Sequence, residues 1–120
     1  MAQQRSELKV TGFRLVSSSF EDGKSLPSRA AYAGGNFSPN LKWGEPPEGT
    51  KSLTLIVDDP DAPRGDWVHW VVFNIPPNFR EFKEGITSED LKKMGAVEGL
   101  TDFGRPGYGG PRPPSGTHRY

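Results

Sequence analysis

The sequence predicts an all-β protein whose strands form an antiparallel, Greek-key-like β-sandwich with one or two short peripheral helices. Residues 53–57 and 67–75 are apolar runs rich in β-branched and aromatic residues, which is typical of strands. The chain also contains 15 glycines and 12 prolines, so turns are frequent. A parallel βαβ arrangement is disfavoured because the connections contain no adequate helix. A small open barrel is the alternative architecture.

Four segments carry the strand pattern. Residues 8–16 mix β-branched, aromatic and polar residues and predict an opening strand, and residues 41–43 predict a short second one. The almost continuous apolar run at 53–57 indicates a strand covered on both faces. In the run at 67–75, alternation puts His69 on the same face as Trp67 and Phe73.

One short helix is predicted at residues 88–94. Thr87 or Ser88 can cap its first turn, acidic residues follow at its N-terminal end, and Gly95 ends it. The following segment 104–116 carries five glycines and four prolines, so we expect an ordered loop or linker there.

Length and composition narrow the class of protein. A chain of 120 residues predicts a single domain spanning residues 1–120, with a modest core. Lys and Arg balance Asp and Glu at 15 each, and no basic stripe is visible, so we expect no nucleic-acid partner. The absence of cysteine excludes disulfides and thiolate zinc sites. No secretory leader or membrane-length apolar run is present, so the expected location is cytoplasmic.

The first polar constellation lies between the two apolar strands. Asp58, Asp59 and Asp61 stand in a proline-bound turn, and His69 follows in the next strand. If the two strands pair as a hairpin, a carboxylate lies near the imidazole and favours its cationic form. The alternative is a plain turn, because Asp-Pro starts turns and Asp caps its own backbone. The bond before Pro63 is also a candidate cis peptide.

The second constellation lies at the end of the sequence. Residues 107–111 are a glycine-proline segment whose backbone N–H groups could face an anion, although an extended linker is the simpler interpretation. His118 and Tyr120 then share one face of an extended strand. The alternative there is a frayed end. If the fold brings both constellations together, they form a small polar pocket for a charged group.

Two enzymatic interpretations stay open but are weaker. Asp59, His69 and Ser115 have the residue types of a hydrolase triad, yet Ser115 lacks the strained Gly-x-Ser-x-Gly elbow. Asp59, Asp61, His69 and His118 have the atom types of a metal site, without a metal-binding spacing. We therefore expect no catalytic residue, no metal and no cofactor.

Several motifs together resemble the phosphatidylethanolamine-binding protein family, in its bacterial and archaeal Raf-kinase-inhibitor-like branch. Residues 36–43 are similar to the family's Ser/Thr-Pro-x-Leu-x-Trp element. Residues 59–63 followed by 67–70 resemble its first signature, and 110–111 followed by 116–120 resemble its second.

The resemblance implies an antiparallel sandwich with a small anion pocket that binds phosphate, phosphorylethanolamine-like headgroups or carboxylates without turnover. It implies that the two imidazoles and the Gly110 N–H hold the anion, while Asp59 orients a histidine or meets an ammonium. Inhibition of a serine protease or a kinase is the alternative function. The implied ligand-binding residues are Asp59, Trp67, His69, Gly110, His118 and Tyr120, with Pro63 and Pro111 shaping the pocket.

The sequence departs from the family pattern at its end. The family continues after the His-Arg-Tyr element with another core strand, whereas this chain stops at Tyr120. The expectation is therefore a truncated domain, or one completed by another polypeptide, such as a second copy in a homodimer. An isolated chain would leave a sheet edge exposed.

Overall fold

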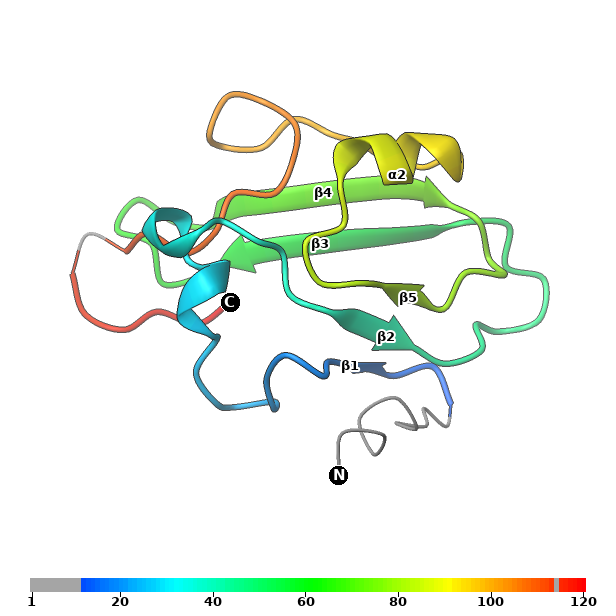
Figure 1. The fold of residues 1–120 in the computed structure, drawn as a ribbon, viewed down its shortest axis with the longest axis horizontal. Coiled ribbons are helices and arrows are strands. Elements are labelled where there is room, and N and C mark those ends of the chain that lie inside the picture. Colours follow the sequence, from blue (N-terminus) through cyan, green and yellow to red (C-terminus); the bar gives the residue numbers. More distant parts are fainter. Residues whose placement is uncertain (1–11, 114) are drawn as a thin grey trace.

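The computed structural model describes residues 12–113 and 115–120, and in them the chain forms two antiparallel three-stranded sheets (Figure 1). One sheet has the order β1-β2-β5 and the other the order β3-β4-β6. The predicted antiparallel sandwich is thereby confirmed, in preference to the open barrel. The strands are β1 (Leu15–Val16), β2 (Leu41–Trp43), β3 (Leu53–Asp59), β4 (Trp67–Ile75), β5 (Glu81–Phe82) and β6 (Val97–Glu98).

The hairpin of β3 and β4 is the longest strand pair of the described residues. Its antiparallel register runs from Leu53 opposite Ile75 to Asp59 opposite Trp67, with two irregularities. Asn74 adopts a left-handed backbone with φ 59°, at one of these irregularities. The hairpin places Asp59 and Trp67 side by side at one end of the sheet, where the predicted polar constellation lies.

The core lies between the two sheets and is built around aromatic contacts. Trp70 and Phe82 are fully buried, one from each sheet, and their ring centroids lie 5.9 Å apart. Trp43 meets the same Phe82 ring edge-on at 5.1 Å, and its indole N–H donates to the Phe79 carbonyl oxygen at 2.9 Å. Such pairs stabilise beyond the area they bury and satisfy the polar atom of the indole.

The helices are short and peripheral. α2 (Ser88–Lys93) is capped by Thr87, one of the two predicted caps, in a capping box: Thr87 accepts from the Asp90 N–H and Asp90 reaches back to the Thr87 N–H. Two 3-10 turns, η1 (Ser28–Ala30) and η2 (Tyr32–Gly34), lie at the end of the molecule to which the C-terminal segment returns (Figure 1). No helix in residues 12–113 and 115–120 is long and apolar enough to cross a membrane.

Three local predictions differ from the structure. The strand predicted at 8–16 is reduced to β1, because Gly12 turns the backbone at φ 71° and its carbonyl accepts from the Arg14 N–H; residues 8–11 lie outside the described part. β3 is covered on one face only, so Ile56 is 59% exposed. The peptide bond before Pro63 is trans, since no cis bond occurs in the described residues.

Candidate functional site

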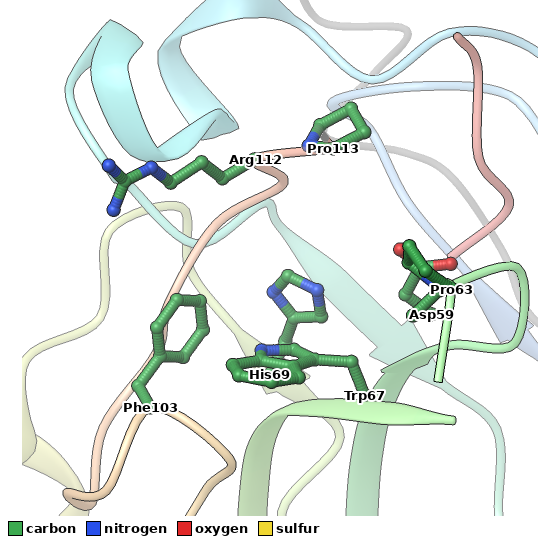
Figure 2. Close-up of a pocket in the computed structure, with 8 residues that line it drawn as sticks. Asp59, Pro63, Trp67, His69, Phe103, Arg112 and Pro113 are labelled. Atoms are coloured by element: carbon green, nitrogen blue, oxygen red, sulfur yellow. The ribbon is translucent and has the colours of Figure 1, made fainter. Parts of the chain in front are cut away.

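A hollow of about 300 Å³ lies at the end of the sheet where β3 and β4 join (Figure 2). The first polar constellation supplies most of its wall, and two loop segments from further along the chain close it. Its lining consists of Asp59, Ala62, Pro63, Trp67, His69, Phe103, Arg112 and Pro113.

His69 stands in the middle of the hollow with a fixed ring orientation (Figure 2). The side chain is 3% exposed, and its Nδ1 lies 2.6 Å from the Gly109 carbonyl oxygen, while the Gly109 N–H donates back to the His69 carbonyl at 3.0 Å. A carbonyl only accepts, so Nδ1 carries the proton of the neutral ring. A second proton on this imidazole must therefore sit on Nε2.

Asp59 ends β3 and pairs with His118, which comes from the end of the sequence. The Asp59 Oδ2 lies 2.6 Å from the His118 Nδ1, and its Oδ1 accepts from the Asp61 N–H at 2.8 Å. Both partners are shielded, with side chains 6% and 9% exposed. The carboxylate thus fixes the His118 ring with Nδ1 as donor, and a second proton again falls on Nε2.

Asp61 and Arg119 hold the same terminal segment from outside. Arg119 donates to Asp61 through its backbone N–H at 2.8 Å and through its guanidinium at 2.8 to 3.3 Å. These hydrogen bonds lower the pKa of the Asp61 carboxyl to about 2. With this anchor in place, the Tyr120 ring meets the His69 ring edge-on at 5.2 Å. Burial and the nearby Asp59 raise the pKa of the Tyr120 hydroxyl.

Gly110 brings two loops into close contact. A β-carbon at this position would lie 2.0 Å from the Ala30 carbonyl oxygen, so only glycine fits. The Gly110 N–H donates to Asn36 Oδ1 at 2.6 Å and is therefore committed to the protein. The role expected for that N–H, donation to an anion, is not available in this arrangement. Pro111 likewise supports the junction, because its carbonyl accepts from the Tyr32 N–H at 2.9 Å.

Of the remaining residues predicted to bind a ligand, two line the hollow and two lie at its edge. Pro63 and Trp67 line the hollow directly, and the Trp67 side chain is 39% exposed. His118 and Tyr120 border it through their contacts with Asp59 and His69. The structure therefore brings the two sequence constellations together at one place.

The geometry does not assemble the two enzymatic alternatives. Asp59 is bonded to His118 and His69 to a backbone carbonyl, so Asp59 does not orient His69 as a triad requires. Asp61 is engaged by Arg119. Among the residues that the structure describes, no group of three or more His, Asp or Glu side chains is placed to hold a metal ion.

Comparison with known proteins identifies the family of the chain. The family model described as phosphatidylethanolamine-binding protein matches residues 16–120, which include every residue discussed above as part of the site. The chain belongs to the phosphatidylethanolamine-binding protein family. The resemblance read from the sequence motifs is thereby confirmed.

Bacterial and archaeal members of the family are close in sequence and structure. A UPF0098 protein of Methanothermobacter thermautotrophicus is 47% identical, over 88% of this chain and 70% of its own length. The UPF0098 protein YbhB of Escherichia coli is 45% identical, over 89% and 73%. The crystal structure of Escherichia coli YbcL, described as a new member of the mammalian PEBP family, is 40% identical and superposes with a TM-score of 0.80, over 88% and 71%.

The chain spans 63% of another such relative, the UPF0098 protein of Aquifex aeolicus.

Sequence reasoning missed four lining residues of the hollow, Ala62, Phe103, Arg112 and Pro113, of which Phe103 and Arg112 have the larger side chains. Phe103 meets the rings of His69 and Trp67 edge-on at 5.3 and 5.6 Å, and Arg112 lines the hollow on the same side of His69 as Phe103 (Figure 2). Both lie in irregular segments, where alternation gives no information on side-chain direction. The glycine at position 109 was the one sequence signal related to Phe103. A β-carbon at Gly109 would lie 2.3 Å from the Phe103 ring, so the ring needs a glycine there.

Proposed function

We propose that this chain is a non-catalytic binding protein that takes a small anionic group, such as a phosphate, a phosphorylated headgroup or a carboxylate, in the hollow around His69. The observation that carries the proposal is the fixed orientation of this imidazole. Its Nδ1–H is used by the Gly109 carbonyl, so a protonated ring presents Nε2–H as a donor inside a shielded site.

His118 supports the proposal in the same way. Asp59 engages its Nδ1, so the cationic ring also has only Nε2–H left to donate. A hydrogen bond between charged partners is shorter and stronger than a neutral one, which suits a small site with few contacts. When the rings are neutral, each Nε2 carries a lone pair and repels an anion. We therefore expect binding to require protonated imidazoles.

Titration calorimetry tests this requirement with inorganic phosphate and with sulfate, whose charge stays constant across the relevant range. Sulfate affinity should fall as pH rises, because deprotonation of each imidazole removes its Nε2–H donor. His69→Ala or His118→Ala should each weaken binding by about tenfold, as expected for the loss of a hydrogen bond to a charged group.

Ser115→Ala is the matched control, because Ser115 is exposed and is not part of the lining. It should bind sulfate like the unaltered chain. Binding that is independent of pH and unchanged in both histidine variants would remove the proposal. Turnover of a phosphate ester or carboxylic ester that is lost in Ser115→Ala would instead establish a hydrolase.

A further inference from the structure

Arg112 lines one side of the hollow, and Tyr32 and Arg105 lie next to it outside the lining; we call Arg112 and Arg105 the cationic rim. The Arg112 guanidinium lies over the Tyr32 ring, 5.0 Å from its centroid. The Arg105 guanidinium donates to the Tyr32 hydroxyl at 3.1 Å, which lowers the pKa of that hydroxyl. The Tyr32 ring in turn stacks on Phe103 with centroids 5.5 Å apart. The rim is therefore joined by ring contacts to the wall of the hollow.

Among the described residues, no acidic side chain forms an ion pair with either arginine of this rim. Within residues 12–113 and 115–120, the arginines in ion pairs are Arg29, with Glu84, and Arg119, with Asp61. Arg112 and Arg105 form no such pair, and both are exposed. Arg112 is held by a cation–π contact, which positions its charge without cancelling it.

On the opposite side of the hollow, Asp59 is the one carboxylate among the lining residues, and its charge is already shared with the His118 ring. Figure 2 shows Arg112 with Phe103 on one side of His69, and Asp59 with Pro63 on the other. Both oxygens of Asp59 are already engaged by protein donors. Asp58 and Asp66 lie near this end of the sheet, but they interact with each other and are not part of the lining.

We propose that the rim of Arg112 and Arg105 selects phosphate esters whose esterified group carries a second negative charge, and disfavours those that carry an ammonium. The proposal rests on the proposed function and adds the class of ligand to it. A phosphate bound at the imidazoles directs its ester substituent to the open side of the hollow. A carboxylate or a second phosphate on that side meets the unpaired Arg112 guanidinium, whose N–H donors can bind carboxylate or phosphate oxygens in a bidentate manner. An ammonium in the same place meets repulsion.

A matched series of two-carbon phosphate esters tests the selection by calorimetry at low salt. Phosphoglycolate carries a carboxylate, ethyl phosphate is neutral at its second carbon, and phosphorylethanolamine carries an ammonium. Affinity should decrease in that order, with about tenfold between the two charged esters, as expected for exposed charge pairs. The difference should shrink as salt is added, because exposed charges are screened.

Variants of Arg112 locate the effect. Arg112→Gln should reduce the ratio between phosphoglycolate and phosphorylethanolamine, Arg112→Lys should retain most of it, and Arg112→Glu should invert it. Arg14→Gln is the matched control, because Arg14 is an exposed arginine beside the other sheet and should leave the ratio unchanged. Thermal unfolding of each variant confirms that the fold is retained.

The possible results distinguish a failure of the proposed charge selection from a failure of the proposed anion binding. If ethyl phosphate binds and all three esters have equal affinity, or if phosphorylethanolamine binds best, the selection by charge is wrong and the anion site stands. If Arg112→Gln leaves the ratio unchanged, the assignment to this rim is wrong. If no ester and no inorganic phosphate binds, the proposed function falls and the selection falls with it.

Discussion

Replacing Asp59 by Asn changes the hydrogen-bonding role of a group that is 4% exposed while keeping its size. Asp59 accepts two hydrogen bonds, from the His118 ring and from the Asp61 N–H. An asparagine can still accept from the Asp61 N–H, but its amide NH₂ then faces the His118 Nδ1. Two donors cannot share that contact, so the neutral His118 ring must change tautomer and carry its proton on Nε2.

The magnitude follows from the bond that is lost. A hydrogen bond to a charged group contributes about 1.5–3 kcal/mol, and the new amide contact to Nδ1 recovers about 1 kcal/mol of it. Asp59→Asn should therefore lower the free energy of unfolding by about 0.5–2 kcal/mol.

Nitrogen NMR of the histidine rings reads the tautomer directly, and urea denaturation gives the free energy of unfolding. Asp58→Asn is the matched control, because Asp58 is the next residue of β3 and is not part of the lining. The reasoning is refuted if His118 keeps its proton on Nδ1 in the neutral Asp59→Asn protein, or if this variant unfolds like Asp58→Asn.

Three further predictions concern the stability of the fold and of the segments around the site. Gly110→Ala forces a methyl group onto a backbone oxygen of η1, so the free energy of unfolding should fall by about 1–3 kcal/mol or more in denaturant titration. Thr87→Ala removes one half of the capping box with Asp90 and should cost about 1 kcal/mol in the same measurement. The pKa of Asp61 is lowered from 3.8 to about 2, so its bond with Arg119 stabilises the fold above about pH 4. That contribution should disappear as pH falls towards about 2, seen as a shift of the Arg119 amide resonance that Asp61→Asn abolishes.

β4 and α2 were predictable because their residues carry a period or a cap, whereas the short strands β5 and β6 were not predicted. The apolar run of β4 gave its bounds, and Thr87, Asp90 and the lysines at the end of α2 gave that helix. β3 was assigned as a strand but with the wrong burial. Its continuous apolar run hides an alternation in burial, since Thr54 and Ile56 are exposed while their neighbours are partly buried.

The pairing inside the site was not predictable from residue spacing. Asp59 and Asp61 precede His69 closely in the sequence, and a carboxylate–imidazole contact with His69 was the natural expectation. Asp59 instead pairs with His118, 59 residues further along the chain, and Asp61 with Arg119. Contacts of loops depend on where the tertiary structure delivers them, and segment 104–116 carries no periodicity from which to infer that.

The single strand β4 separates the aromatic core from the hollow. His69 and Trp70 are consecutive residues, both almost fully buried, one turned toward the hollow and the other toward Phe82. A ligand that immobilises the imidazole therefore damps local opening of the strand, so deuterium should enter the β4 amides more slowly when the hollow is filled. Conversely, replacing Trp70 by a smaller residue should weaken ligand binding, although Trp70 does not line the hollow.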